Sequence, residues 1–396
     1  MTDKEVMTLA DANIMHTYKR FPLVIVKGSG QKVWGLNGKE YLDFVAGIAV
    51  CNLGHSHPRV VAAVREQLEM LTHVSNLYYT EPQALLAKLL TDNSFADKVF
   101  FCNSGAEANE AAIKLARKYA HENLGDDKFE LITMKNSFHG RTMATIAATG
   151  QEKFQAGFAP LLAGFTYVPF NDLSALEAAI SKKTCGVMLE PIQGEGGVNI
   201  PDTRYLSGVR KICDQNGLLL IVDEVQTGIG RTGKLFGYEH SGIEPDIMTL
   251  AKALGNGFPV GAMLARDKIA QAFSPGNHAS TFGGNPVVMA AARATVESIL
   301  QSGILENCQK VGEYFLSQLK KLQQKHKIIK EVRGKGLMLA VALDIEAQDI
   351  VNKCMEKGLL INSTGGKTLR FVPPLIISDE DVDQAMKILD EVMEGK

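Results

Sequence analysis

The feature that most constrains the fold is a series of short apolar runs that alternate with helical segments between residues 58 and 282. The seven runs cover residues 99–102, 130–134, 166–169, 186–189, 218–223, 247–250 and 260–265. Apolar runs of this length, followed by turn residues, are typical of strands buried on both faces of a parallel sheet. Because helices alternate with these strands, the sequence predicts a doubly wound α/β domain, which we place at residues 58–282.

The segments before and after this region predict a second, smaller domain. Residues 24–44 alternate apolar and polar side chains around Asn37-Gly38, a pair that is typical of hairpin turns. The C-terminal part has long amphipathic segments, a strand over residues 336–343 and a final helix that Ser378 caps. The sequence has no long linker, so we expect residues 1–57 and 283–396 to pack together as one α+β domain.

Composition and charge limit the classes of partner. The 396 residues carry 42 basic and 44 acidic side chains, and the net charge of −2 is too small to attract nucleic acid or a membrane surface. No stretch approaches the roughly 20 apolar residues of a membrane span, and the first residues lack the apolar core of an export signal. The six cysteines form no CxxC pair, which favours reduced thiols. We expect a cytoplasmic protein with a small-molecule ligand.

The sequence offers one close pair of histidines, His55 and His57, in Gly-His-Ser-His-Pro. A zinc site needs three or four ligands at defined spacings, and this pair lacks a third ligand nearby. The glycine, serine and proline around the histidines are typical of a turn. We therefore predict turn residues here and no metal site.

Two of the predicted strands end in side chains that can do chemistry. Asp223 closes the run 218–223, and Lys252 follows the run 247–250 after a single alanine. Loops at the carboxyl ends of parallel strands are where α/β proteins bind their ligands. A lysine at such a place is most often a solvated surface charge. The alternative is a nucleophile, because a partly desolvated amine loses its proton more easily and forms a Schiff base with a carbonyl compound.

A candidate anion site follows the first strand of the series, at residues 103–107 (Asn-Ser-Gly-Ala-Glu). Ser104, Gly105 and Ala106 lead into a predicted helix. The amides in the first turn of a helix have no partner within the helix, and a glycine lets the backbone approach a phosphate closely. The alternative is an ordinary capped helix, with Glu107 in its first turn and basic residues later.

Residues 228–233 match the nucleotide-binding pattern GxGxxG and, with Lys234, nearly match GxxxxGK[ST]. Both matches fail in their context. Leu235 stands where a P-loop has the hydroxyl that binds magnesium, and the segment does not join a strand directly to a helix. A nicotinamide-dependent dehydrogenase built on this segment is the alternative from another class, and it would require these residues to open a helix.

Two segments together resemble the signature of the class-III aminotransferases. The first is Leu-Ile-Val-Asp-Glu-Val-Gln-Thr-Gly at residues 220–228 with Arg231 and Gly233, and the second is residues 246–252. The resemblance extends over nearly the whole chain. It implies a fold-type-I enzyme with a large domain around a mostly parallel seven-stranded sheet. It also implies that pyridoxal 5'-phosphate (PLP) is the cofactor and that a homodimer holds it at the interface.

The resemblance further implies roles for the residues of the cofactor site. Lys252 would bond covalently to the cofactor and later move the proton of the reaction, and Asp223 would keep the pyridine nitrogen protonated. The ring would lie between Val225 and Phe138, although either side chain could simply belong to the core. The other implied contacts are Gln226 at the ring hydroxyl, Ser104, Gly105 and Ala106 at the phosphate, and Thr281 from the opposite subunit.

For the substrates, the resemblance implies two arginines that bind carboxylates. Arg141 would bind a carboxylate far from the reacting amine, and Arg370 would bind the α-carboxylate of glutamate. Glu195 would pair with Arg370 while the amine donor is bound and would release it for glutamate. Without the resemblance, surface salt bridges would be the plainer role for these three residues.

We expect the chain to transfer the δ-amino group of N2-acetylornithine to 2-oxoglutarate, a step of arginine biosynthesis. Ornithine, 4-aminobutyrate, succinylornithine and succinyldiaminopimelate are alternative amine donors within the family, because acyl recognition depends on a pocket shape that motifs do not fix. A binding protein without catalysis would keep the fold and would tolerate the loss of Lys252 or Asp223.

Overall fold

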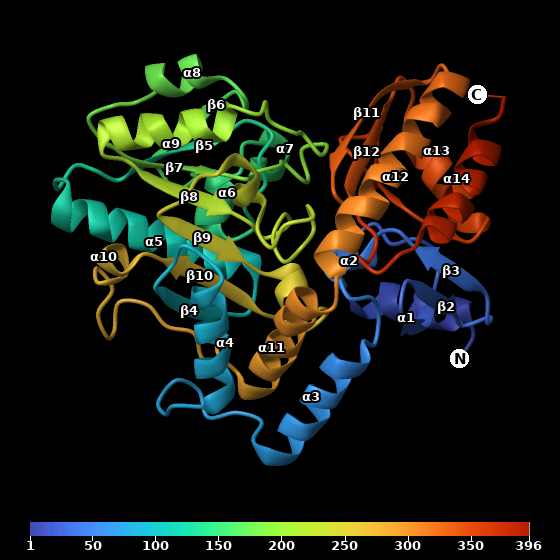
Figure 1. Ribbon diagram of the computed structural model, residues 1–396, viewed down its shortest axis with the longest axis horizontal. Helices are drawn as coiled ribbons and strands as arrows, with labels where there is room; N and C mark the ends of the chain where they lie inside the picture. Colours follow the sequence, from blue (N-terminus) through green and yellow to red (C-terminus); the bar gives the residue numbers. More distant parts are fainter. Residues whose placement is uncertain (396) are drawn as a thin grey trace.

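The seven predicted strands form one sheet (Figure 1). The computed structural model describes residues 1–395. The strands are β4 (Lys98–Cys102), β5 (Glu130–Met134), β6 (Phe165–Val168), β7 (Thr184–Leu189), β8 (Leu219–Asp223), β9 (Ile247–Leu250) and β10 (Gly261–Ala265). Their order in the sheet is β4-β10-β9-β8-β7-β5-β6. The predicted fold class, a mostly parallel seven-stranded sheet with a smaller domain beside it, is confirmed.

One strand of this sheet runs against the others. β10 pairs antiparallel with both β9 and β4, whereas the pairs among β5, β6, β7, β8 and β9 are parallel. Residues 251–260 join β9 to β10, and this connection is shorter than the dozen or so residues that a parallel crossover needs. Because β10 is reversed on both sides, the carboxyl ends of β4, β5, β7, β8 and β9 meet at one edge.

Helices cover both faces of this sheet (Figure 1). Leu115, from α5, belongs to one buried apolar cluster with Ile221, whereas Val209, from α9, belongs to another with the adjacent residue Leu220. Successive strand residues point to opposite faces, which explains why an unbroken apolar run is needed here. The helices of this region are α3 (Pro58–Met70), α4 (Glu81–Asp92), α5 (Gly105–Asn123), α6 (Met143–Ala148), α7 (Glu152–Gln155), α8 (Leu173–Ala178), α9 (Tyr205–Asn216), η1 (Gly237–Ser241), η2 (Lys252–Gly255) and α10 (Asp267–Ala270).

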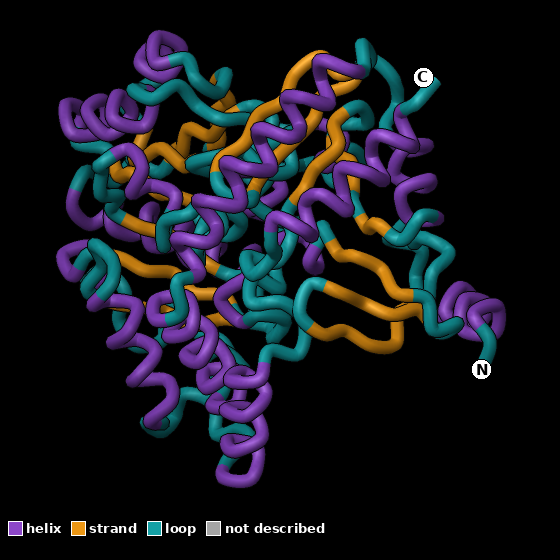
Figure 2. Tube along the Cα trace, turned by 45° about the vertical axis from the view of Figure 1, so that its right-hand side comes forward, coloured by secondary structure: helices purple, strands orange, loops and turns teal. Residues whose placement is uncertain are grey.

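The smaller part of the molecule contains both chain ends (Figures 1 and 2). One sheet has the order β1 (Ile25–Ser29), β2 (Lys32–Gly35), β3 (Glu40–Asp43) and β13 (Leu359–Leu360), and the other β11 (Ile329–Lys335), β12 (Met338–Leu343), β15 (Thr368–Phe371) and β14 (Asn362–Thr364). The helices are α1 (Asp3–Asn13), α12 (Ile304–Lys325), α13 (Gln348–Glu356) and α14 (Asp379–Met393). β13 pairs with β3, so the N- and C-terminal segments share a sheet. Ser378 caps α14, as predicted.

Two helices connect these regions, the short α2 (Ala46–Ala49) and the long α11 (Pro286–Gln301). α11 packs mainly against α3 and α4 of the larger part, and it also contacts η2 and, in the smaller part, α12. The division of the chain into a large domain at residues 58–282 and a small domain at residues 1–57 and 283–396 stays our proposal, with α11 at the junction.

The glycine-rich segment 228–233 lies in turns after β8 and opens no helix, so it lacks the context that a dinucleotide site requires. Its Arg231 is fully buried. The guanidinium Nη1 donates to the carbonyl oxygens of Leu337 at 2.8 Å and Pro373 at 2.6 Å, and Nη2 donates to the side chain of Asn52. The segment therefore fastens the two parts of the molecule together.

Two sequence expectations concern membranes and metals. Within residues 1–395, every helix is too short or too polar to cross a bilayer. Over the same residues, no three His, Cys, Asp or Glu side chains gather as a metal site would require. Of the two neighbouring histidines, His55 interacts with a carboxylate of the protein, because its imidazole Nε2 lies 2.7 Å from the carboxylate of Asp43.

Candidate active site

The carboxyl ends of the large sheet open into a cavity of about 460 Å³. The segments after β4, β5, β7, β8 and β9 each contribute to its walls. Among the lining residues are Ser104, Gly105, Ala106, Phe138, Arg141, Glu190, Asp223, Val225, Gln226 and Lys252. The structure thus brings most of the predicted site residues together at the edge of the sheet where α/β proteins bind ligands.

Lys252 enters this cavity from the end of β9 with a strained backbone. Its φ is +44°, a left-handed conformation that is uncommon for residues other than glycine and that costs about 1 to 3 kcal/mol. Burial lowers the pKa of its amine, an effect that nearby Glu195 and Asp223 oppose and Arg370 reinforces. A lysine of this kind is partly neutral more readily than a surface lysine, so it can act as a nucleophile and a base.

Asp223 lies at the end of β8 within a network of buried hydrogen bonds. Its Oδ2 accepts from Nδ2 of Asn109 at 2.7 Å and lies 2.8 Å from Nδ1 of His139, and its Oδ1 accepts from the amide of Val225 at 3.0 Å. Burial acts to lower the pKa of His139, but the hydrogen bond and the charge of Asp223 raise it overall. These bonds hold the aspartate in one orientation at the wall of the cavity.

The N-terminus of α5 provides a place for a phosphate. Ser104 is the N-cap, and its Oγ accepts from the amide of Glu107 at 3.1 Å. The next amides, of Gly105 and Ala106, line the cavity, and first-turn amides have no partner within a helix. A Cβ atom at Gly105 would lie 2.8 Å from Val225, so only glycine allows this close approach.

Glu190, at the end of β7, is fully enclosed beside this network. Its Oε2 accepts from the amide of Phe138 at 3.0 Å, and its Oε1 accepts from the amide of Gly194 at 3.1 Å. Burial raises the pKa of Glu190 to about 7, an effect that the charge of His139 opposes. One carboxyl group therefore ties the loop that carries Phe138 to the loop that precedes Glu195.

An ion pair between a buried arginine and a partly exposed glutamate lies next to the cavity. Nη1 of Arg370 lies 2.6 Å from Oε1 of Glu195, and the arginine side chain is almost inaccessible to solvent. Gln226 connects this pair to the cavity, because its Nε2 donates to Glu195 at 3.4 Å. Burial would raise the pKa of Glu195, but the charges of Arg370 and Lys252 lower it. The glutamate is therefore an anion that keeps the guanidinium occupied.

Arg141 and Thr281 have different surroundings from the other predicted residues. The guanidinium of Arg141 is exposed at the wall of the cavity, 5.5 Å from the ring centroid of Phe138 and 4.1 Å from that of Phe154. Thr281 is exposed outside the cavity of its own chain, and its carbonyl oxygen accepts from Oγ of Ser75 at 3.1 Å. A second copy of the chain would be needed to bring this hydroxyl to a cofactor.

The sequence analysis missed Asn109, His139 and Glu190. His139 lies inside the Phe-His-Gly-Arg motif at residues 138–141, where only the phenylalanine and the arginine received a role. Glu190 directly follows a predicted strand, which is the same signal that pointed to Asp223. Asn109 lies within α5 and has no such signal, because only the fold brings it next to β8.

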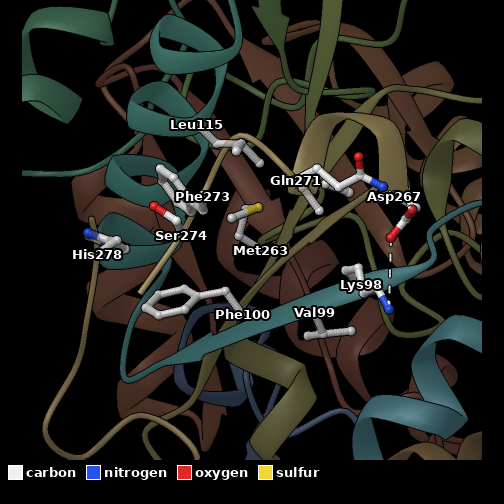
Figure 3. Close-up of a pocket in the computed structure, with 12 residues that line it drawn as sticks. Lys98, Val99, Phe100, Leu115, Met263, Asp267, Gln271, Phe273, Ser274 and His278 are labelled. Carbon is white, nitrogen blue, oxygen red and sulfur yellow. Dashed lines mark hydrogen bonds and ion pairs between the residues drawn. The ribbon is translucent and has the colours of Figure 1, made fainter. Parts of the chain in front are cut away.

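A second cavity, of about 320 Å³, lies between β4, β10, α5 and the segment after α10 (Figure 3). Phe100, Met263 and Phe273 point into it. The charged residues of its lining, Lys98 and Asp267, have largely exposed side chains 3.8 Å apart. Neither of these two charges is desolvated. His278 also lines the cavity, and burial and the charge of Lys114 lower the pKa of its imidazole, but no carboxylate or amine of the lining is buried beside it, whereas the first cavity gathers Asp223, Glu190 and Lys252.

Comparisons with known proteins agree on one family. The model of the class-III aminotransferases matches residues 14–393. The chain is 58% identical over 381 residues to the acetylornithine aminotransferase of Caldanaerobacter subterraneus subsp. tengcongensis, which covers 96% of this chain and 97% of the relative. The solved acetylornithine aminotransferase of Elizabethkingia anophelis superposes with a TM-score of 0.90 at 35% identity over 99% of both chains.

A second solved structure concerns the cofactor. The ornithine aminotransferase of Toxoplasma gondii superposes with a TM-score of 0.95 at 35% identity, over 99% of this chain and 94% of the other, and PLP partially occupies its active site. The match of the family model, the extent of the similarity and the strand-end lysine and aspartate lead to the same conclusion. The chain belongs to the class-III aminotransferases, a family of PLP-dependent enzymes.

Proposed function

We propose that this enzyme transfers the δ-amino group of N2-acetylornithine to 2-oxoglutarate, giving N-acetylglutamate 5-semialdehyde and glutamate. The observation that carries the proposal is the Glu195–Arg370 pair beside the Lys252 cavity, because it allows one site to accept two differently charged substrates. The choice of the acylated donor rests on the 58% identity with a relative of that name. The reaction would be a step of arginine biosynthesis.

The residues of the cavity fit PLP. The glycine-lined N-terminus of α5 suits its phosphate, and the amine of Lys252 suits its aldehyde carbon. Val225 and Phe138 would contact its ring, and Gln226 its hydroxyl. When bound, the cofactor supplies a ring that accepts the electrons left when a proton leaves the substrate carbon next to the amine.

Lys252 would hold the cofactor and would carry the proton of the reaction. An amine must be neutral to accept a proton, and burial lowers the pKa of Lys252. The left-handed backbone fixes where the side chain starts. Asn256, at the end of the same turn, joins it to residues 53 and 54. Its side chain accepts from the amide of Leu53 at 2.8 Å and donates to the carbonyl of Gly54 at 3.0 Å.

Asp223 would keep the pyridine nitrogen protonated. A carboxylate next to a cation typically shifts the pKa of the cation's proton by about 1 to 3 units in favour of the charged form. Asn109 and His139 hold the carboxylate through two bonds to the same oxygen, Oδ2. We expect these two residues to act through Asp223 by fixing its direction.

Glu195 and Arg370 would select between the two substrates. The amine donor presents its ω-amino group and has no carboxylate for Arg370, so Glu195 keeps the guanidinium paired. Glutamate and 2-oxoglutarate carry an α-carboxylate that would replace Glu195 on Arg370. Arg141, exposed at the cavity wall, would bind the carboxylate that lies far from the reacting carbon in either substrate.

We also propose a homodimer with shared active sites. Thr281 is exposed next to the apolar side chains of Leu77, Tyr79 and Phe282, which are also exposed. Asn76 joins the two segments, because its Nδ2 donates to the carbonyl of Ser280 at 3.0 Å. An exposed apolar patch of this kind marks an interaction surface. The proposed compartment is the cytoplasm, which fits the six unpaired cysteines.

The test is a steady-state comparison of N2-acetylornithine and ornithine as donors, with 2-oxoglutarate as acceptor. We expect kcat/KM to be at least about 10-fold higher for the acylated donor. A preference for free ornithine would overturn the donor assignment, and assays with 4-aminobutyrate, succinylornithine and succinyldiaminopimelate would then identify the substrate. A dehydrogenase is not favoured, because residues 228–233 open no helix.

A further inference from the structure

The loop at residues 193–199, which carries Glu195, has a strained backbone. Val198 has a φ of +55° and is completely buried, although β-branched residues rarely adopt left-handed conformations. Gln193 and Asn199 close the loop through two backbone hydrogen bonds of 3.1 and 3.0 Å. Strain of this kind persists only where neighbouring groups hold the conformation in place.

Three strands of the small domain hold this loop. Arg333, from β11, donates from Nη2 to the carbonyl of Gly197 at 2.7 Å and from Nε to the carbonyl of Val198 at 3.1 Å. The hydroxyl of Thr364, from β14, donates to the carbonyl of Glu195. Arg370, from β15, contributes the ion pair with the carboxylate of Glu195.

These restraints differ in what can compete for them. The ion pair joins two side chains, and the carboxylate of a substrate can take the place of Glu195 on Arg370. Arg333 and Thr364 bind backbone carbonyls, which a substrate carboxylate does not displace. The guanidinium of Arg333 is also paired at 2.5 Å with Glu331, on its own strand. The backbone restraints therefore remain when the ion pair opens.

We propose that Arg333 and Thr364 are positioning residues that keep the Glu195 loop fixed while the Glu195 side chain leaves Arg370. The inference rests on the proposed function, because it assumes that a dicarboxylate binds Arg370. It makes the exchange between substrates a side-chain rotation and not a movement of the loop or of the small domain.

Kinetics of the variant Arg333→Met test this role. While the amine donor is bound, the ion pair still holds the loop, so we expect kcat/KM for the donor to change by less than about 3-fold. When 2-oxoglutarate binds, the variant loop also loses the ion pair, so only the bond from Thr364 and the 3.4 Å contact of Arg370 with the carbonyl of Gly194 hold it. We therefore expect KM for 2-oxoglutarate to rise about 10-fold. Equal losses for the two substrates would overturn the proposal.

Hydrogen exchange in the PLP-loaded enzyme provides a readout that does not depend on turnover. Glutarate is the probe, because it has two carboxylates and no group that reacts. In the wild type, we expect the amides of Gly197 and Val198, which donate to the carbonyl of Gly194, to keep their protection when glutarate binds. In the variant Arg333→Met, we expect the binding of glutarate to remove the protection of these two amides. Loss of protection in the wild type would contradict a fixed loop.

Three further variants serve as controls. Glu331→Gln removes the ion pair of Arg333 but keeps its bonds to the carbonyls, so we expect changes below about 2-fold. Arg333→Lys should recover part of the protection of the amides of Gly197 and Val198. If Arg333→Met does not fold, the lysine variant can be compared with the wild type in its place. Thr364→Val should resemble Arg333→Met more weakly, and Thr364→Ser should resemble the wild type.

The outcomes separate this proposal from the proposed function. If glutarate does not compete with 2-oxoglutarate in the wild type, the assignment of Arg370 to a dicarboxylate is wrong. If glutarate competes but Arg333→Met weakens donor and acceptor alike, only the positioning role fails. The exchange experiment does not depend on which acylated amine is the amino-group donor.

Discussion

Two carboxylates that act on the pKa of Lys252, Asp223 and Glu195, are held in different ways. Asp223 lies at the end of a strand, is almost completely buried, and receives hydrogen bonds from Asn109 and His139, both of the large domain. Glu195 lies in a loop, is partly exposed, and forms its ion pair with Arg370 from the small domain. One carboxylate is fixed by its own domain, and the other bridges two parts of the molecule.

This difference corresponds to two demands of a reaction with two half-reactions. The ring nitrogen must stay protonated in both, so its partner gains from rigid, buried contacts. The group that reads the α-carboxylate must be free in one half-reaction and occupied in the other. The ion pair between Glu195 and Arg370 meets the second demand if a substrate carboxylate can replace Glu195. The buried guanidinium of Arg370 then has an anion beside it in both half-reactions.

The largest effect is expected for Lys252, because the charges of both carboxylates act on the pKa of its amine. Lys252→Ala removes both the covalent attachment and the base, and we expect turnover to fall by at least about 10⁴-fold. Borohydride reduction of the wild type should attach the cofactor to residue 252, which peptide mapping can detect. Lys234→Ala, directly after the glycine-rich segment, is the matched control and should retain turnover. A label elsewhere would refute the assignment.

The second prediction concerns the fixed carboxylate. Asp223→Asn keeps the shape of the side chain but removes its charge, and we expect both half-reactions to slow by about 100-fold, corresponding to a change of about 2 pKa units at the ring nitrogen. Single-turnover absorbance measures each half-reaction. Asp246→Asn is the control, because this buried aspartate pairs with Arg210 at 2.8 Å away from the cavity. A loss confined to one half-reaction would contradict the expectation that Asp223, unlike Glu195, serves both half-reactions equally.

The sequence was sufficient for the large sheet but not for every element. Strands buried on both faces produce long apolar runs, and all seven were recognised. Helix α1 was missed because none of its residues is buried, so it has no apolar periodicity. A signal was present, since Thr2 and Glu5 form a capping box with a bond of 2.8 Å from the amide of Thr2.

The candidate site shows a similar division. Asp223 and Lys252 could be found from strand ends, and the family resemblance supplied Glu195 and Arg370. Their supports could not be found, because Asn109, Arg333 and Thr364 act through contacts between segments far apart in sequence. Hydrogen bonds to backbone carbonyls leave no pattern in the sequence, since many residue types can make them.

The third prediction concerns the exchangeable carboxylate. Glu195→Ala leaves Arg370 buried without its anion, which favours the binding of any substrate carboxylate there. We expect kcat/KM for the amine donor to fall about 10-fold more than kcat/KM for glutamate. Initial rates of both half-reactions measure this ratio. Equal losses would mean that the pair has only a structural role.

The smallest effect is expected for Glu190, which hydrogen-bonds both the Phe138 segment and the amide of Gly194. Burial raises its pKa from 4.5 to about 7, so the folded protein binds an extra proton between these pH values and loses this stabilisation as the pH rises through them. Glu190→Gln should therefore reduce the Tm difference between pH 5 and pH 8 by about 3 °C.

Glu224→Gln is the matched control for this last prediction. Burial also raises the pKa of Glu224 to about 7, but its carboxylate accepts from the amides of Gly237 and Tyr238, away from the Glu195 loop. We expect both variants to change the pH dependence of Tm, and only Glu190→Gln to alter the ratio of donor and glutamate KM, by about 2-fold. If Glu224→Gln altered that ratio equally, the change in the ratio would not depend on the bond between Glu190 and the amide of Gly194.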